Sequence, residues 1–227
     1  MSDKELNIVN NDGIWKVDFN SGEDELLVSI EELIKLKPQP SFENALHKVN
    51  HVMIAPDGKS FIFIHRWYVG HRRFDRLVFS DFKELKILSS EEMVSHLCWV
   101  DSNTLFGYLR HNGKDGFFFV NISSGDFFSC KELNSLGNGD GHPSCHGDWI
   151  VFDTYPDKSR MQHLYLYNYK SSEVFHLLEL FHGLKYWGES RCDLHPRFSP
   201  DGRRVYFDTV YKGFRRLAWI DISSLVN

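Results

Sequence analysis

The sequence of 227 residues has few cysteines and no long apolar run. Its four cysteines show no C-x-x-C pairing, which favours reduced thiols in a cytoplasm over a disulfide framework. No window approaches the ~20 apolar residues that a membrane helix requires. The first residues also lack the basic start and apolar stretch of a secretory signal. We therefore expect a cytoplasmic protein that binds no membrane.

An excess of basic residues is also missing. The formal net charge is −5 and the pI is near 6.2, so the chain has no global positive field to hold nucleic acid through its phosphates. The nucleophile motif G-x-S-x-G, the P-loop and the dinucleotide-binding glycine motif do not occur. These absences argue against nucleic-acid binding, serine hydrolase chemistry and nucleotide binding.

Apolar and aromatic side chains are abundant. Hydrophobic residues make up 42% of the chain and aromatic residues 15%, which indicates a well-filled core. At this length we expect one domain over residues 1–227. Gly, Pro, Asn and Asp interrupt the apolar pattern too often for long helices, and a helical pattern persists only at Ser29 to Leu36 and at Leu177 to Phe181.

One hairpin motif recurs along the chain. In its clearest copy, Arg191 to Thr209, the turn Ser199-Pro200-Asp201-Gly202 joins strand-like segments at Leu194 to Ser199 and Arg203 to Thr209. Each copy places a histidine shortly before its turn. These histidines are about 45 to 53 residues apart, and they are His51, His96, His142 and His195.

Repeats of this length, each with four short strands, predict an all-β fold, a β-propeller of four-stranded antiparallel blades. We expect four to five blades: a partial blade over residues 1–45 and blades starting near residues 46, 91, 140 and 190. The first unit has at most Leu6 to Asn10 for an inner strand, and the last ends after its third strand. Either five blades close with an irregular first one, or the chain is an arc of a larger ring. Unpaired blade edges predict self-association.

The topology of a blade should bring the four histidines to one rim, because the second strand of each blade returns antiparallel to the strand that the histidine begins. Imidazoles from adjacent blades and a carboxylate could hold a divalent metal, and the natural set is His142, His195 and Asp193. Asp193 lies two residues from His195 and would face the same side of a strand. Alternatively, each histidine hydrogen-bonds the neighbouring blade as part of the repeat.

The segment His65 to Arg76 combines basic residues with aromatic ones. Such a patch suits an acidic oligosaccharide, because arginine binds carboxylates bidentately and aromatic rings stack on sugars. A solvated loop with ordinary surface charge is the alternative. The residues that we expect to bind substrate are His51, His65, Arg72, Arg110 and Asp153.

At HPRFSPDGRRVYFDT the sequence resembles the TolB-like propeller repeat. GHPSCHGDWIVFDTYPD and RCDLHPRFSPDG are similar to the oligogalacturonate lyase group, and this similarity covers about four blades from Lys48 onward. The resemblance implies a manganese ion held by histidines of neighbouring blades, including a His-x-His pair. Here that pair reads Asp193-Leu194-His195, which keeps an oxygen ligand suited to manganese.

The same resemblance implies metal-assisted β-elimination on uronate oligosaccharides, as in pectin degradation. Arg66 would then hold the sugar acid, and His96 would be the base or its proton partner. The second hypothesis is a non-catalytic propeller that serves as a binding or assembly module. The missing inner strand favours this module, whereas the polar rim favours the lyase.

Overall fold

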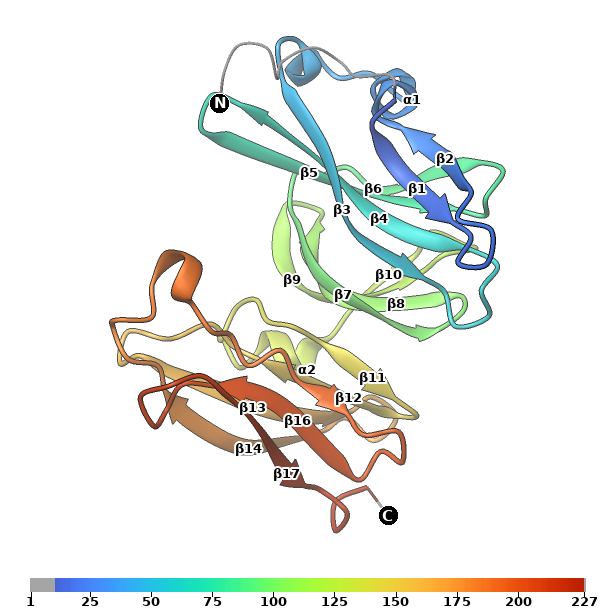
Figure 1. Ribbon diagram of the computed structural model, residues 1–227. Coiled ribbons are helices and arrows are strands. Elements are labelled where there is room, and N and C mark those ends of the chain that lie inside the picture. Colours follow the sequence, from blue (N-terminus) through green and yellow to red (C-terminus); the bar gives the residue numbers. More distant parts are fainter. Residues whose placement is uncertain (1–10, 227) are drawn as a thin grey trace. The chain divides into compact units, whose positions relative to one another are not determined.

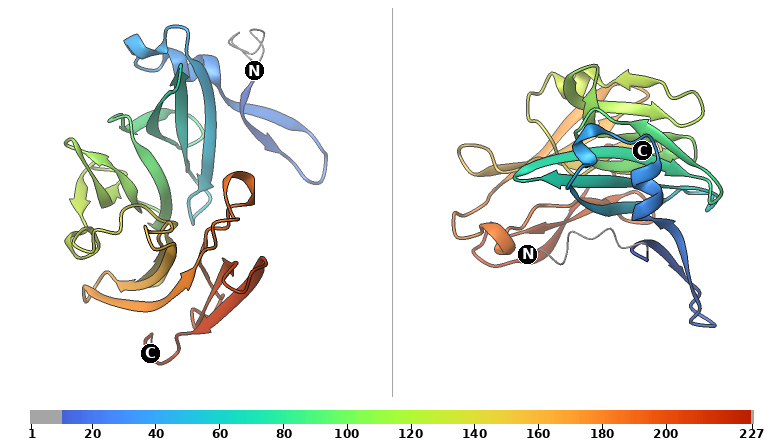
Figure 2. Two further views of the ribbon diagram at one scale, coloured as in Figure 1. Left: turned by 90° about the vertical axis from the view of Figure 1, so that its left-hand side faces the viewer. Right: turned by 90° about the horizontal axis from the view of Figure 1, so that it is seen from above.

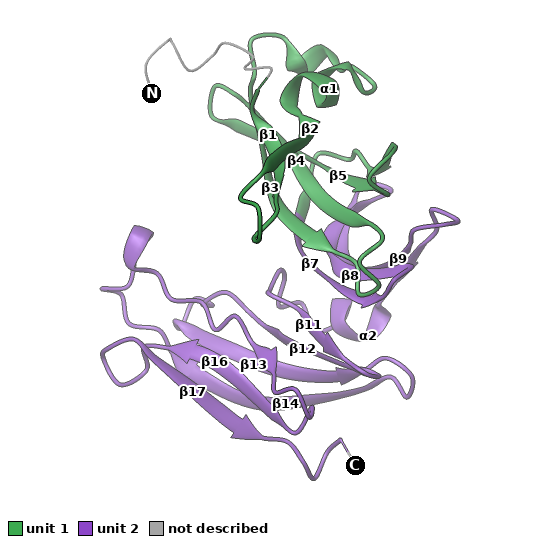
Figure 3. Ribbon diagram, turned by 45° about the vertical axis from the view of Figure 1, so that its right-hand side comes forward, with its two compact units in different colours: residues 1–94 green, residues 95–227 purple. Residues whose placement is uncertain are grey.

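The computed structural model describes residues 11–226, which form mostly antiparallel β-sheet (Figure 1). The chain divides into two compact units, residues 1–94 and 95–227 (Figure 3). The single domain expected over residues 1–227 stays a prediction. The possible inner strand at Leu6 to Asn10 lies outside the described residues.

Unit 1 holds a two-stranded and a four-stranded sheet, in which neighbouring strands follow each other in the sequence. The first sheet is the β1–β2 hairpin, a separate ribbon beside the β3–β6 sheet (Figure 2). The strands are β1 (Gly13–Val17), β2 (Asp24–Ser29), β3 (Leu46–Ile54), β4 (Phe61–Val69), β5 (Arg72–Ser80) and β6 (Leu85–Ser89), and a 3-10 turn spans Pro40–Phe42.

The short helix α1 (Ile30–Lys35) follows β2 and confirms the helical pattern at Ser29 to Leu36. Ser29 begins it with a capping box, because its hydroxyl accepts from the Glu32 backbone N–H while Glu32 accepts from the Ser29 backbone N–H. At the other end, the Arg76 guanidinium donates to the Leu36 carbonyl at 2.7 Å. With six residues, α1 is the longest helix of residues 11–226, so no described helix could span a membrane.

Unit 2 holds three antiparallel sheets, with strand orders β7–β10, β11–β14 and β15–β17. Two of them have four strands and the last has three. The strands are β7 (Val94–Asp101), β8 (Thr104–His111), β9 (Lys114–Asn121), β10 (Phe127–Ser129), β11 (Ser144–His146), β12 (Trp149–Asp153), β13 (Met161–Asn168), β14 (Glu173–Phe181), β15 (Arg197–Phe198), β16 (Arg204–Thr209) and β17 (Arg216–Asp221). Helix α2 (Lys131–Asn134) and a 3-10 turn at Gly188–Ser190 complete the unit.

Apolar side chains fill the space between successive sheets of unit 2. Phe117 of β9 packs on Phe152 of β12, with ring centroids 5.3 Å apart. On the next face, Val151 of β12 shares a buried cluster with Val205 of β16. Each fully buried side chain of this kind contributes about 1.5–3 kcal/mol. Because both faces of the β11–β14 sheet are covered, its strands need not alternate between apolar and polar residues.

The all-β class and the four-stranded antiparallel blades are confirmed. The turn at Ser199–Gly202 is confirmed too, since the Gly202 N–H donates to the Ser199 carbonyl at 2.9 Å and Gly202 has φ +71°. All four cysteines are thiols, as expected.

Two local predictions are wrong. The segment Leu177 to Phe181 belongs to strand β14, because its residues 178–181 pair with β13 and Leu177 is the additional residue at a bulge. The strand expected at Leu194 to Ser199 is reduced to β15, because His195 takes φ +43° and its backbone N–H binds Asp153 in place of a neighbouring strand.

Candidate functional site

Three of the four repeat histidines lie side by side in unit 2. The ring centroid of His142 is 4.0 Å from that of His96 and 3.9 Å from that of His195. His96 comes from β7, whereas His142 precedes β11 and His195 precedes β15. Each of the three sheets therefore contributes one imidazole to this histidine cluster. His51, the fourth, lies in unit 1 on β3, where it takes φ +54°.

The buried carboxylate of Asp153 fixes two of these histidines. Asp153 ends β12, and its Oδ1 accepts from the His142 backbone N–H at 2.6 Å and contacts His142 Nδ1 at 2.9 Å. Its Oδ2 accepts from the His195 backbone N–H at 3.0 Å. Since the carboxylate holds a proton on His142 Nδ1, the lone pair of this ring is on Nε2, as in carboxylate–histidine–metal arrangements.

A glycine allows this close contact. A Cβ atom at Gly141 would lie 1.8 Å from the Asp153 carbonyl oxygen, a distance that no side chain tolerates. The backbone before His142 can therefore approach the end of β12 only without a side chain at position 141.

Asp193 is next to the cluster and is held by an arginine. The guanidinium of Arg191 binds the Asp193 carboxylate bidentately, with Nε to Oδ2 at 2.8 Å, and this hydrogen bond raises the pKa of Arg191. The same guanidinium lies over the ring of Tyr155, 4.5 Å from its centroid. Burial raises the pKa of Tyr155 to about 12, so that its hydroxyl is protonated at neutral pH.

The side chains of His142, Asp193 and His195 could hold one metal ion. Each offers a ligand atom, and these atoms all lie within 4.8 Å of one another. Burial, followed by the nearby His142, lowers the pKa of His195, so this imidazole is neutral at pH 7 and can donate a lone pair. The donor set of two nitrogens and one oxygen fits a first-row divalent ion.

His96 lies at the edge of this group. Its Nδ1 is 3.2 Å from the Ser95 hydroxyl, which in turn donates to the Asp140 carboxylate. Burial raises the pKa of Asp140. The serine thus links the His96 ring to a carboxyl group of the neighbouring segment, which fixes the ring orientation.

Of the residues predicted to form a site, five come together here: His96, His142, Asp153, Asp193 and His195. Asp153 was expected to bind substrate, but it is fully buried and supports the two histidines. Asp193 and His195 lie together in an irregular segment before β15, and not by alternation on a strand. Arg110 binds Asp115 across the β8–β9 hairpin at 2.6 Å.

The other predicted residues belong to unit 1. His65 is fully buried, where its Nδ1 accepts from Arg76 Nε at 2.9 Å and its Nε2 contacts His47 Nδ1. Burial, followed by the nearby Arg76, lowers the pKa of His65 to about 2. Arg66 binds the buried Asp75. These contacts favour structural roles for His65 and Arg66, and their roles in binding and catalysis stay predictions.

Arg72 is an exposed residue of the basic segment, and it binds Glu92 at 2.9 Å. The guanidinium of Arg72 also lies over the Phe74 ring, 4.4 Å from its centroid. Its role in substrate binding, like that of His51, stays a prediction.

Sequence reasoning missed Arg191, Tyr155 and the Ser95–Asp140 pair. Arg191 precedes Asp193 by two residues in the same repeat motif, so an opposite charge beside a candidate ligand was the available signal. Tyr155 follows Asp153 beyond the end of β12, where the sequence pattern gives no direction for a side chain.

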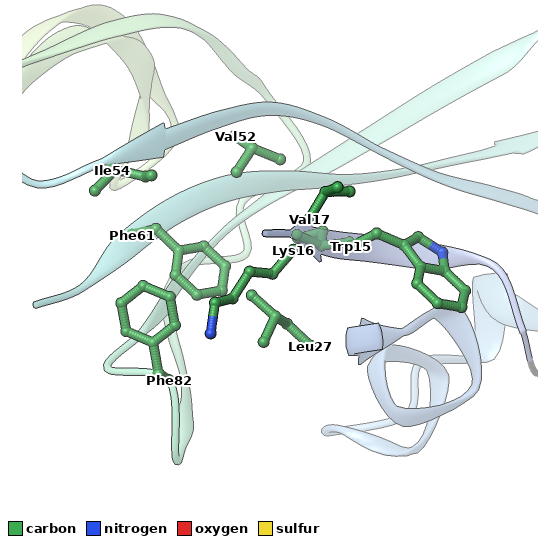
Figure 4. Close-up of a pocket in the computed structure, with 9 residues that line it drawn as sticks. Trp15, Lys16, Val17, Leu27, Val52, Ile54, Phe61 and Phe82 are labelled. Carbon is green, nitrogen blue, oxygen red and sulfur yellow. The ribbon is translucent and has the colours of Figure 1, made fainter. Parts of the chain in front are cut away.

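A surface pocket of unit 1 has a different character (Figure 4). One positive charge, on Lys16, lies among apolar side chains, so this pocket lacks the convergent polar groups of a catalytic site. Its lining residues are Ile14, Trp15, Lys16, Val17, Leu27, Val52, Ile54, Phe61 and Phe82.

Solved structures share this fold at low sequence identity. TolB from Acinetobacter baumannii matches with a TM-score of 0.60 and 13% identity, over 92% of this chain and 46% of TolB. An oligogalacturonate lyase in complex with manganese matches with a TM-score of 0.62 and 17% identity, over 91% of this chain and 53% of the lyase. The oligogalacturonate lyase from Vibrio parahaemolyticus matches with a TM-score of 0.61 and 16% identity, over 91% of this chain and 53% of the lyase.

The chain therefore spans about half the length of the solved structures that it matches. The sequence itself matches no protein-family model and no curated protein. At such identities a structural likeness concerns the fold and not the activity. This chain has the β-propeller fold of TolB and of oligogalacturonate lyase.

Proposed function

We propose that this chain carries a metal-dependent lyase site that acts by β-elimination on uronate oligosaccharides. The observation that carries the proposal is the convergence of His142, Asp193 and His195 within 4.8 Å. It is supported by the likeness of the fold to a lyase that is in complex with manganese. The acidic sugar chain is the proposed partner.

The reaction removes the proton α to a uronate carboxylate and breaks the C–O bond at the β carbon, so that a C=C bond forms and the oxygen leaves with the next sugar and takes up a proton. The negative charge that develops must be stabilised. A divalent ion held by His142, Asp193 and His195, manganese in this proposal, would supply a Lewis acid for that carboxylate. His96, which lies against His142, would take the proton or exchange it with the base. Ser95 orients the His96 ring for this transfer.

The carboxylate of the sugar also needs a positive partner from the protein. Arg191 is half exposed and lies in the same group of side chains, so it is a candidate for this contact. The earlier candidate, Arg66, is bonded to Asp75 within unit 1. Kinetics of Arg191→Gln and Arg66→Gln distinguish the two candidates. Replacing the arginine that binds the sugar carboxylate should raise the KM for oligogalacturonate, and replacing the other should not.

The test is a manganese titration of the metal-free chain by calorimetry, together with the ultraviolet absorbance of an unsaturated uronate product. His142→Ala and His195→Ala each remove a proposed metal ligand. Each should weaken manganese binding by more than the ~10–100-fold that is typical when a residue bonded to a ligand, rather than the ligand itself, is replaced. His96→Ala should leave manganese affinity unchanged and abolish product. His146→Ala is the matched control and should change neither, because His146 is an exposed histidine at the far end of β11.

Asp193→His tests the same site in the other direction. It restores the His-x-His pair of the lyase resemblance and should tighten manganese binding. If the wild-type chain binds no manganese, forms no product, and the histidine variants lose thermal stability alone, the lyase proposal is wrong.

A non-catalytic binding or assembly module is the second candidate. The bidentate pair between Arg191 and Asp193 favours it, because this pair neutralises Asp193 without an ion. Binding of oligogalacturonate with no product at any manganese concentration would identify the module.

A further inference from the structure

We propose that the β13–β14 hairpin carries a second divalent-metal site, of the zinc class, formed by His163, His176 and Glu179. This group shares no residue with the site of His142, and the proposal does not rest on the proposed function. Both strands belong to unit 2 and lie next to each other in one sheet (Figure 1).

A β-bulge brings the three side chains to one face of the hairpin. His163 of β13 pairs directly with Glu179 of β14, and Tyr165 pairs with His176. His176 and Glu179 are three residues apart and would face opposite sides of a regular strand. The register shift between Leu164 and Tyr165 places an additional residue in β14, which turns both toward His163.

The ligand atoms already have spacings close to those of a tetrahedral ion. His163 Nδ1 is 3.2 Å from His176 Nε2 and 3.8 Å from Glu179 Oε2. Metal bonds of zinc sites to nitrogen and oxygen are short enough that neighbouring ligands of a tetrahedron are about 3.4 Å apart. Binding an ion would therefore require only small shifts of the side chains.

A carboxylate lies near the other ring nitrogen of His163, the central histidine of the group. Asp157 Oδ2 is 3.9 Å from His163 Nε2, while Asp157 Oδ1 is held by the Met161 backbone N–H at 2.8 Å. At 3.9 Å the two groups make an electrostatic contact and no hydrogen bond, and a small movement of the Asp157 side chain would let it accept a proton from Nε2 and leave the lone pair of Nδ1 for a metal. The group thus has three ligands and an outer-shell partner.

The group is also held in place and accessible. The Tyr165 ring packs on the His176 ring with centroids 4.9 Å apart, and Asn138 donates to the Tyr165 hydroxyl at 2.8 Å. His176 and Glu179 are exposed, so an ion can enter from solvent and keep a water molecule as fourth ligand. Two imidazoles and one carboxylate bind zinc more tightly than manganese.

The experiment is a titration of the metal-free full chain with Co²⁺, followed by visible absorption, and with Zn²⁺, followed by calorimetry. Tetrahedral Co²⁺ absorbs strongly in the visible range, and Zn²⁺ should displace it. The titration uses the His142→Ala background, because the site of His142 has the same donor set and could also bind Co²⁺. In this background His176→Ala and Glu179→Gln should each abolish the band. Asp157→Asn keeps the oxygen that accepts from Met161 and should weaken binding by ~10–100-fold.

Glu173→Gln is the matched control, because Glu173 is an exposed glutamate at the start of the same strand. The Co²⁺ absorption band of this variant should be unchanged. The band should persist in His142→Ala, which separates this site from the manganese site. In the His142→Ala background, zinc should also raise the Tm of the chain with and without Glu173→Gln but not that of the chain with His176→Ala. The proposal is overturned if the wild type and the double variant His176→Ala/Glu179→Gln bind Zn²⁺ with equal stoichiometry and affinity, since the group is then a hydrogen-bonded surface cluster.

Discussion

At the scale of single residues, Asp153 determines the geometry of the histidine cluster. It is fully buried and accepts hydrogen bonds from two backbone N–H groups and one imidazole. Asp153→Ala would leave all three donors buried without a partner, and such losses are costly for charged acceptors. We expect a loss of about 3 kcal/mol in the free energy of unfolding.

Urea unfolding of this variant measures the loss. Asp126→Ala removes an exposed carboxylate of the same unit and should change the free energy by no more than ~0.5 kcal/mol. Equal effects of the two substitutions would show that Asp153 does not organise the cluster.

The buried imidazole of His65 predicts a pH dependence in unit 1. Its pKa is lowered to about 2 by burial first and then by Arg76, so below pH 6.5 the unfolded chain binds a proton that the folded chain does not. Its contribution to stability is therefore fully present above pH 6.5 and declines as the pH falls, by about 1.4 kcal/mol per pH unit.

Unfolding measured between pH 6.5 and 5, above the range in which carboxylates titrate, tests this dependence. His65→Gln should reduce the slope of stability against pH, whereas His71→Gln, at an exposed turn of the same unit, should leave it unchanged. An unchanged slope in His65→Gln would mean that His65 takes up a proton in the folded state.

At the scale of elements, local backbone chemistry made the hairpins predictable. The turn residues Ser199 to Gly202 specify a backbone conformation that neighbours in space hardly alter, and Gly202 takes the expected positive φ. The strand before this turn depends on a distant group instead. The backbone N–H of His195 binds Asp153, which lies in another sheet, and the local sequence contains no sign of this bond.

The segment at Leu177 to Phe181 shows how a bulge misleads sequence reasoning. The sequence predicts a helical pattern there because Gly, Pro, Asn and Asp do not interrupt the segment, and His176 and Glu179 flank or lie in it at a spacing that a helix face also has. In the structure the same spacing arises from the bulge in β14. The proximity of His142, Asp193 and His195 could be predicted from the repeated histidines. The opposite charges of Arg191 and Asp193 were visible in the sequence, but the geometry of their pair was not, since it depends on the irregular segment before β15.

Gly141 gives a prediction for the segment before β11, which lies against the end of β12. Gly141→Ala places a Cβ against the Asp153 carbonyl and must displace the backbone before His142. We expect it to weaken manganese binding and to lower stability by about 1–3 kcal/mol, the range for overpacking. Gly183→Ala, where the nearest atom is 3.8 Å away, is the control and should change neither quantity. Manganese affinity equal to that of the wild type in Gly141→Ala would contradict the close contact.

At the scale of the whole molecule, we propose self-association through strand edges. β17 pairs with β16 alone among the described strands, which leaves one edge without a neighbouring strand in residues 11–226. Two large apolar side chains on this strand, Leu217 and Trp219, are 69% and 55% exposed. An edge of this kind can pair with the edge of a second copy, which would cover both the backbone groups and these side chains.

Sedimentation velocity over a range of protein concentrations tests this proposal. The wild-type chain should shift from monomer to dimer as the concentration rises, and Trp219→Lys should suppress the shift, because charged residues prevent pairing of strand edges. Trp187→Lys is the control, since Trp187 is 81% exposed but lies outside the strands and should leave association unchanged. A wild-type chain that stays monomeric at every concentration rules the edge interface out, and equal suppression by both lysine variants assigns association to general surface hydrophobicity.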